Sequence, residues 1–409
     1  MTTPEEIEKF RVDYGREVML RLKQEILASN KDGKVIFSGH RGCGKSTLLK
    51  RLAIEMQSQQ FVVFFSIADL VEPSAISPIN ILYAIALQLL SAATRANISV
   101  APDIQQDLLG WMKSERKQIA STETKSEMGF GVEKLLELAT LKLQQEKAFR
   151  DEVEIVFEKR VSDLVLRIDR LAATIQIATQ KEVLVIIDDL DKLSLDLAES
   201  LFQNNVKSLF SPKIRIVFTV PIAVSQEPKV MGALNSAGVV RPYLFPVAKF
   251  FPKQETRNPN AEPIARTFNL FLEVLKKRIP ESCIEPETAH KMVLKSGGVM
   301  RELVRIGREC CTEAMFQLEL DPDRPEVKID DEILTVALRN LRLDFSRQLQ
   351  PELLEVLGRV YRSQKREDPE DNFTKLLHGL MVLEYENDRL WYDVHPIVVD
   401  LLRQEELIE

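Results

Sequence analysis

The chain has little cysteine, few aromatic residues and no excess of positive charge. Only four of its 409 residues are cysteines, and they lack the spacing of a metal site. Adjacent Cys310 and Cys311 suit no ordinary disulfide, so this cysteine usage fits a reducing compartment. The formal net charge of −7 argues against unspecific nucleic-acid binding through overall charge, and leaves a local basic face as the alternative.

Long hydrophobic runs are also missing. The longest, FVVFFSIADL and ILYAIALQLLSAA, are too short to span a bilayer. The first residues, MTTPEEIEKF, are acidic and lack the apolar centre of a signal peptide. We therefore expect a cytoplasmic protein with no membrane partner. A chain of 409 residues can form two or three domains.

One glycine-rich stretch, KVIFSGHRGCGKSTLL at residues 34–49, has the spacing of a phosphate-binding loop. In this pattern Gly39 is followed, after four intervening residues, by Gly44, Lys45 and Ser46. Glycines permit backbone angles that side chains forbid, and let amide groups turn towards an anion. The N-terminus of the following helix, which is the positive end of the helix dipole, also favours an anion at this position. Lys45 would reach the β- and γ-phosphates, and the Ser46 hydroxyl would ligate Mg²⁺.

The residues around this loop support the interpretation. Residues 35–37 have the pattern of a short buried strand, and STLLKRLAIEM repeats apolar residues at helical spacing. Two alternatives stay open: a glycine-rich turn that binds nothing, and a Cys43 that is redox-sensitive rather than merely small. The candidate nucleotide-binding residues are Gly39, Arg41, Gly42, Cys43, Gly44, Lys45, Ser46 and Thr47.

A second anchor for Mg²⁺ is expected at the end of a neighbouring buried strand. The run at residues 183–187, VLVII, is typical of a strand buried on both faces of a parallel sheet. It is followed by Asp188, which we assign to Mg²⁺, and by Asp189, which lies where an acid that polarises the attacking water would sit. The alternative, a helix cap followed by a surface acid, fits Asp191 better than Asp188.

The next predicted strand, KIRIVFTVP, places the polar Thr219 after an apolar run. Ligands bind beyond the carboxyl ends of strands in open α/β sheets, so Thr219 would touch the γ-phosphate or the attacking water. The alternative is a threonine selected only for its β-propensity.

The loop, the strand before Asp188 and the strand with Thr219 follow one another in a known order. In this order the chain resembles the AAA+ and STAND group of P-loop ATPases, and within that group it resembles the initiator-like and KAP-like bacterial members. The matching stretches are GHRGCGKST (Walker A), VLVIIDDLDK (Walker B) and Thr219 at the sensor 1 position. KSGGVMRELVRI looks like the sensor 2 region, in which Arg301 would reach back from a helical lid to the nucleotide. The resemblance covers about residues 10 to 310. It implies ATP as the nucleotide.

Two departures and one further residue bear on the mechanism. AAA+ motors usually carry Asp-Glu after the Walker B strand, whereas this chain has Asp188 and Asp189, which implies slow hydrolysis and a switch rather than a motor. The membrane insertions of KAP relatives are not evident in the sequence. The resemblance also places Arg241 where a neighbouring subunit would contribute an arginine finger, unless it is only a solvated loop residue.

The remaining segments predict the domain organisation. The core would comprise residues 1–252, with a helical insertion at about 108–181 that either packs on the core or projects towards a partner. Within it, residues 122–131 have the composition of a mobile loop. Residues 253–320 show three helical patterns, an α-helical lid, and 321–409 follow the order of a winged-helix-like domain.

We therefore expect a doubly wound α/β P-loop core with a helical lid and a winged-helix-like C-terminal domain. The favoured function is an ATP- and Mg²⁺-dependent switch that controls self-association or an effector protein, which the resemblance links to bacterial antiviral defence. One alternative is a DNA-binding AAA+ ATPase of the initiator or transposition-regulator kind. It is disfavoured because the helix around residues 371–380 offers few basic side chains. Another is an ATP-binding scaffold without turnover.

Overall fold

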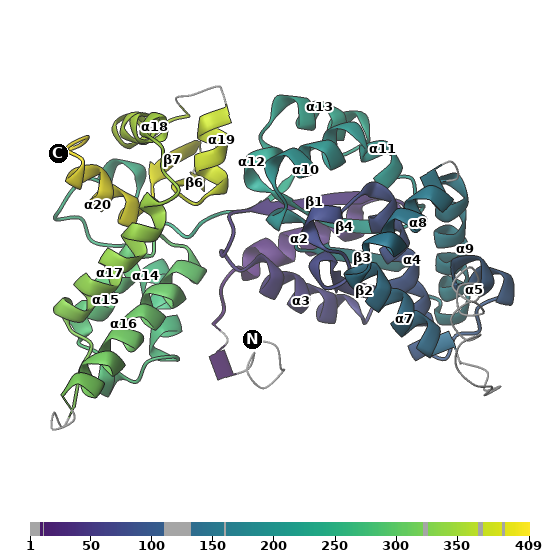
Figure 1. The fold of residues 1–409 in the computed structure, drawn as a ribbon, viewed down its shortest axis with the longest axis horizontal. Coiled ribbons are helices and arrows are strands. Elements are labelled where there is room, and N and C mark those ends of the chain that lie inside the picture. The colour runs from purple at the N-terminus through teal and green to yellow at the C-terminus, as the bar shows by residue number, and fades with distance from the viewer. Residues whose placement is uncertain are drawn as a thin grey trace. The chain divides into compact units, whose positions relative to one another are not determined.

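The computed structural model describes residues 9–10, 12–109, 132–158, 161–321, 326–366, 371–386 and 389–409. Its contacts divide the chain into two compact units (Figure 1). The sheet unit consists of Glu17–Ser38 and Ser46–Tyr243, and the helical unit of Met1–Arg16, Gly39–Lys45 and Leu244–Glu409. The loop predicted to bind phosphate is thus grouped with the C-terminal part. The predicted borders at 252/253 and 320/321 stay predictions.

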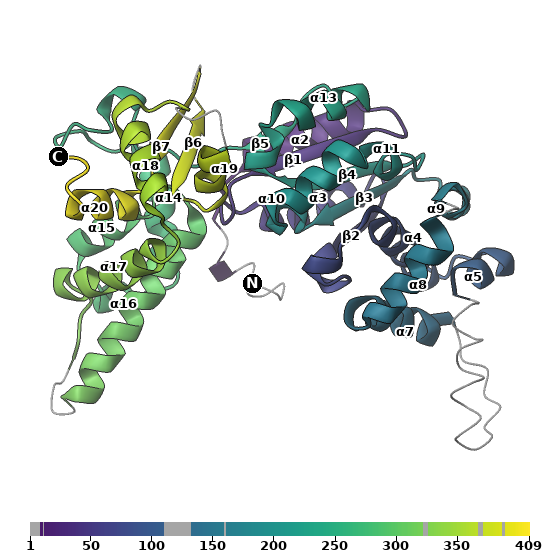
Figure 2. The same cartoon turned by 45° about the horizontal axis from the view of Figure 1, so that its top comes forward.

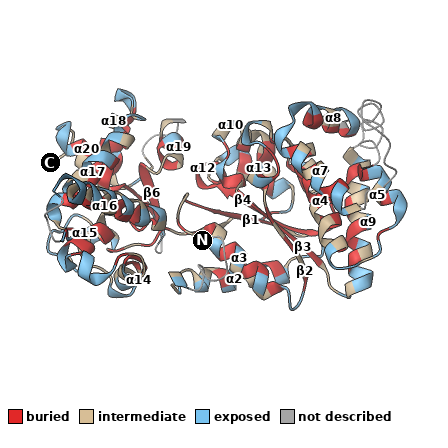
Figure 3. Ribbon diagram, turned by 60° about the horizontal axis from the view of Figure 1, so that its bottom comes forward, coloured by how far each residue is buried: buried red, intermediate tan, exposed pale blue. Residues whose placement is uncertain are grey.

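The sheet has five strands in the order β2-β3-β4-β1-β5. They are β1 (Lys34–Gly39), β2 (Phe61–Ser66), β3 (Val183–Asp188), β4 (Arg215–Pro221) and β5 (Tyr243–Phe245). Every residue of β3 and β4 is buried, as expected for central strands of a parallel sheet (Figure 3). β3 pairs in parallel with β2 and β4, and the register sets Ser66 opposite Asp188. This is the predicted P-loop NTPase core.

The helices of the sheet unit include a long interior one, α4 (Pro78–Arg95), with 11 buried residues. Ser77 caps it by accepting a hydrogen bond from the Asn80 N–H, and Pro78 occupies the first turn. The others are α2 (Arg16–Ala28), α3 (Lys45–Met56), α5 (Pro102–Leu109), α7 (Val132–Gln145), α8 (Lys147–Glu158), α9 (Val161–Thr179), α10 (Leu195–Glu199), α11 (Val206–Leu209), α12 (Ile222–Ser225) and α13 (Pro228–Ser236).

The predicted insertion at about 108–181 contains α7, α8 and α9. In α9 the apolar stripe predicted from the sequence is buried, including Leu164, Ile168, Leu171 and Ile175. These side chains belong to the same hydrophobic core as strands β2, β3 and β4. The described helices of the insertion therefore pack on the core, the first of the two alternatives. The predicted mobile loop at 122–131 lies outside the described residues.

The helical unit contains the three predicted lid helices, α14 (Ala265–Lys276), α15 (Pro286–Lys295) and α16 (Met300–Leu320). They are followed by α17 (Asp331–Ser346), α18 (Pro351–Ser363), α19 (Asp371–His378), β6 (Val382–Glu386), β7 (Leu390–Val394) and α20 (Pro396–Gln404). Strands β6 and β7 form an antiparallel pair with Tyr385 opposite Trp391. Helix, strand, strand and helix follow in the order expected of a winged-helix-like module (Figure 2). No helix in the described part of the chain is long and apolar enough to cross a membrane.

Candidate phosphate and metal site

The glycine-rich stretch forms a tight loop between β1, which ends at Gly39, and α3, which begins at Lys45. Gly42 and Gly44 have φ angles of +84° and +105°, a region that other L-residues rarely adopt. A Cβ on Gly39 would lie 2.6 Å from the carbonyl oxygen of Phe245. Glycine is therefore required in this loop both for its backbone angles and for the close approach of a neighbouring chain segment.

The loop lysine is buried, with 4% of its surface exposed. Its Nζ donates to the carbonyl oxygens of Gly39 and His40, each at 2.8 Å. The ammonium group is thus held over the loop by the loop's own backbone. A bound phosphate would compete with these carbonyls for the same charge, and would form stronger, charge-assisted hydrogen bonds.

Three loop residues contact the C-terminal segments of the helical unit, and sequence reasoning missed these contacts. The backbone N–H of Glu384 in β6 donates to His40 Nε2 at 2.8 Å. Burial, followed by the charge of Lys45, lowers the His40 pKa to about 3, so the ring is neutral. Arg41 Nη2 lies 2.8 Å from His378 Nε2, and the N–H of Arg301 donates to the Gly42 oxygen at 3.0 Å.

Cys43 completes the loop as a buried thiol whose Sγ donates to the His40 oxygen at 2.9 Å. This burial favours the small-residue interpretation of Cys43 over the redox one. Arg301, the predicted sensor 2 residue, is the second residue of α16 and has an exposed side chain. Thr47, on the first turn of α3, is also exposed. The helical unit thus brings the loop residues and Arg301 together.

The two predicted magnesium ligands lie next to each other in the sheet unit. The Ser46 side chain lies beside the carboxylate of Asp188, the last residue of β3, which is 3% exposed. Burial, and then the charge of Asp189, raise the Asp188 pKa to about 6. Carboxylate oxygens of Asp188, Asp189 and Asp191 lie within 4.8 Å of one another. A hydroxyl among buried, mutually repelling carboxylates is a donor set that fits Mg²⁺.

Asp189 adopts a left-handed backbone conformation, with φ at 70°. Its Oδ2 accepts a hydrogen bond of 2.7 Å from Ser66 Oγ, and its Oδ1 lies 2.6 Å from Lys192 Nζ. Both carboxylate oxygens of the predicted base therefore have a partner. Ser66 ends β2, and the rule that polar residues after apolar strands gather at one sheet edge could have found it.

Thr219 lies within β4 rather than at its end, because the strand continues to Pro221. The predicted strand KIRIVFTVP likewise ends at Pro221, and the contact of Thr219 with a phosphate or water stays a prediction. The Thr219 hydroxyl is fully buried, accepts from the Leu190 N–H at 3.0 Å and donates to the Ile187 oxygen at 3.2 Å. In this structure the Thr219 hydroxyl links β4 to the segment that follows β3 through these two hydrogen bonds. Arg241, the predicted arginine finger, is exposed between α13 and β5.

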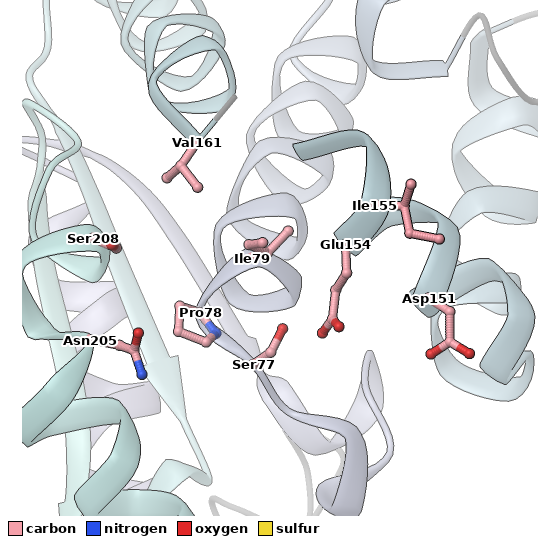
Figure 4. A pocket seen from close by; sticks show the side chains of 9 residues that line it. All are labelled: Ser77, Pro78, Ile79, Asp151, Glu154, Ile155, Val161, Asn205 and Ser208. Carbon is pink, nitrogen blue, oxygen red and sulfur yellow. The ribbon is translucent and has the colours of Figure 1, made fainter. Parts of the chain in front are cut away.

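A separate cavity of about 490 Å³ lies in the sheet unit at the start of α4 (Figure 4). Glu154 extends into it from α8 towards Ser77, and Val161 and Ile79 add apolar groups (Figure 4). Glu154 also accepts from Asn80 Nδ2 at 3.1 Å. The described lining of this cavity contains none of the residues predicted to bind nucleotide.

Comparison with known proteins gives one match to a family model and several distant likenesses to solved structures. A model of the KAP family P-loop domain matches residues 18–220, which agrees with the P-loop NTPase fold of the sheet unit. Cdc6p from Pyrobaculum aerophilum is 12% identical, with 98% of this chain and 99% of that chain covered and a TM-score of 0.39. The Aeropyrum pernix Orc1 protein, solved in complex with DNA, is 12% identical, with 96% and 93% covered and a TM-score of 0.37. Drosophila ORC bound to DNA is 11% identical, with 96% and 90% covered and a TM-score of 0.38. A search among curated proteins finds no significant match.

Proposed function

We propose that this chain, whose residues 18–220 match a KAP-type P-loop domain, binds ATP with Mg²⁺ and hydrolyses it slowly as a nucleotide-dependent switch. The observation that carries the proposal is the proximity of the Ser46 side chain to the buried carboxylate of Asp188. It brings the hydroxyl that follows the loop lysine against a buried carboxylate at a strand end. A turn that binds nothing gives no reason to hold two oxygen donors of this kind together.

Each residue has a defined task in this proposal. The glycine loop and Lys45 hold the phosphates, and Ser46 and Asp188 hold the metal ion. A magnesium ion, when bound, neutralises charge on the phosphates. Asp189 Oδ2 is the atom that would accept a proton from the attacking water. The hydrogen bond from Ser66 occupies this oxygen, Lys192 pairs with the other oxygen, Oδ1, and the side chain is one methylene shorter than glutamate. Both features support slow turnover.

The switch proposal depends on the contacts between the loop and the C-terminal segments of the helical unit. His40 and Gly42 bond directly to β6 and to the first turn of α16. A phosphate that reorganises the loop would therefore act on the backbone of both elements. This supports a coupling of nucleotide state to self-association or to an effector partner. The link to antiviral defence depends on the family resemblance alone.

Nucleotide binding and turnover of three variants test this proposal. Lys45→Ala should abolish ATP binding, whereas Asp189→Asn should bind ATP and lose turnover by about 10²-fold or more. Lys50→Ala is the matched control because Lys50 is an exposed lysine on the same helix. The proposal is wrong if Lys45→Ala and Asp189→Asn both hydrolyse ATP like the parent.

Self-association is tested separately. We expect the mass distribution of the full chain, measured by mass photometry, to differ between ADP and a non-hydrolysable ATP analogue. If the ATPase rate per subunit rises with protein concentration in the parent but not in Arg241→Ala, Arg241 acts in the site of a neighbouring subunit. Equal, flat rates for both proteins would remove Arg241 from the mechanism.

A further inference from the structure

The cavity at the start of α4, of about 490 Å³, carries negative charge. Its described lining lies wholly within the sheet unit. Two of the lining residues, Asp151 and Glu154, are carboxylates one turn apart on α8, and the described lining contains no lysine, arginine or histidine. The volume is in the range of small-molecule sites. A ligand that suits this cavity should therefore carry positive charge.

Neither carboxylate is neutralised by a neighbour. Among the described residues, none forms an ion pair with Asp151 or Glu154. Glu154 Oε1 accepts a hydrogen bond of 3.1 Å, but its donor is the uncharged amide of Asn80. The N-terminus of α4, which Ser77 caps, adds only about half an elementary charge against two carboxylates. The negative charge is therefore available to a ligand.

The unpaired groups at this end of the cavity are all hydrogen-bond acceptors. Asn80 is 1% exposed, and its Nδ2 donates to Glu154 Oε1 and to the Ala75 oxygen. Its Oδ1 is buried and has no donor among the described residues. The Asp151 carboxylate and the second oxygen of Glu154 also have no described donor. Unpaired acceptors next to a cavity call for a ligand that donates hydrogen bonds.

The wall across from α8 is polar but uncharged. Figure 4 shows Asn205 and Ser208 on one side of Pro78 and Ile79, and the carboxylates of α8 on the other. Asn205 Nδ2 donates to the Ser200 oxygen at 3.0 Å, which leaves the carbonyl oxygen of the amide as an acceptor. The apolar surface between the two polar walls can pack against methylene groups, as it would against a lysine side chain.

We propose that this cavity binds an aliphatic diamine or polyamine. One ammonium group pairs with Asp151 and Glu154, the methylene chain packs on Pro78 and Ile79, and a second ammonium group donates to the oxygens on the opposite wall. A divalent metal ion would use the carboxylates but would gain no ligands from the apolar residues. The proposal does not rest on nucleotide binding, because no residue assigned to the nucleotide lines the cavity.

Calorimetric titration of the full chain, without nucleotide, tests the proposal. The probes are putrescine and spermidine, together with butylamine, which has one ammonium group, and butanediol, which has none. We expect saturable binding of at least one of the two polyamines. Butylamine should bind about tenfold more weakly or less, and butanediol more weakly still, because each lacks hydrogen bonds from a charged donor.

Substitutions that remove one charge and keep the side-chain shape locate the binding. Asp151→Asn and Glu154→Gln should each weaken binding of the tighter polyamine about tenfold. Glu137→Gln is the control, because it removes the same charge from an exposed position on α7 outside the cavity lining. Thermal unfolding checks that all three variants fold. The proposal is overturned if neither polyamine binds, if butylamine binds as tightly, or if the two cavity variants bind like the parent.

Calcium chloride, titrated into the same proteins, distinguishes an amine site from a metal site. We expect any calcium binding to be unchanged in Asp151→Asn and Glu154→Gln. Calcium binding that both substitutions weaken, and that neither polyamine displaces, would assign the cavity to a metal ion and overturn the proposal.

Discussion

Ser66 Oγ donates a hydrogen bond of 2.7 Å to Asp189 Oδ2, and thereby joins the ends of two adjacent parallel strands through the carboxylate proposed as the base. The hydrogen bond occupies the oxygen that would accept a proton from the attacking water. The relationship makes Ser66 a positioning residue for Asp189. Substitution of Ser66 therefore tests whether this bond limits the rate of hydrolysis.

We predict that Ser66→Ala raises ATP turnover about tenfold, because a hydrogen bond to a charged group contributes about 1.5 kcal/mol to the resting arrangement. Steady-state phosphate release measures the effect. Ser58→Ala is the matched control, since Ser58 is an exposed serine in the turn before β2. Unchanged or lower turnover in Ser66→Ala would show that the bond does not restrain the base.

Gly42→Ala should destabilise the protein by about 1–3 kcal/mol. The residue has φ +84°, and a Cβ there would lie 2.5 Å from the Cβ of Arg301. Gly232→Ala provides the contrast: Gly232 lies within α13, and a Cβ would meet no atom within 4 Å. That change should be neutral or stabilise by up to about 1 kcal/mol. Urea denaturation compares the two variants, and equal midpoints would contradict the close approach of Gly42 and Arg301.

Stability should fall with acidity because of His395. Burial lowers its pKa to about 3, so between pH 3 and 6.5 the unfolded chain binds a proton that the folded chain does not. The contribution of His395 is present above pH 6.5 and decreases as pH falls below it. The decrease is about 1 kcal/mol between pH 7.5 and 5.5.

The matched variant for this prediction is His395→Asn. His395 Nδ1 accepts a hydrogen bond from the Ile397 N–H at the start of α20, and asparagine can supply the same cap without titrating. Urea unfolding at both pH values should show a smaller loss of stability in His395→Asn than in the parent. An identical loss in both proteins would exclude His395 as a source of the pH dependence.

The four cysteines should differ in reactivity. Cys283 is exposed, whereas Cys43 and Cys310 are buried, and burial raises the Cys310 pKa to about 12. At neutral pH, iodoacetamide should modify Cys283 first, and Cys43 and Cys310 at rates set by unfolding. Peptide mass spectrometry after timed alkylation measures the order. Rapid modification of Cys43 in the native protein would revive its interpretation as a redox-sensitive residue.

Much of the sheet unit could be predicted because its signals are local. The Walker A pattern fixes a strand, a loop and a helix within a few residues, and β1 and α3 have the expected positions. The apolar run before Asp188 likewise predicts β3. The hydrogen bond from the Leu190 N–H to the Thr219 hydroxyl could not be predicted, because it joins two segments of the sheet that strand propensity does not relate.

The contacts of the loop could not be predicted, since they join residues far apart in sequence. His40 and Glu384 are separated by 344 positions, and no periodicity links them. The ion pair between Lys192 and Asp189 is partly local, because the two residues are only three positions apart. It still could not be predicted with certainty of position, since it forms only in the particular turn that follows β3.

Calorimetric titration of ATP into the full chain, with Mg²⁺ and with a chelator, tests the central claim most directly. Saturable heat that is absent in Lys45→Ala, and a Mg²⁺ requirement that is lost in Asp188→Asn, are the results expected if the glycine loop holds the phosphates and Asp188 the metal ion. No heat from adenine or guanine nucleotides in the presence of Mg²⁺ would contradict the claim.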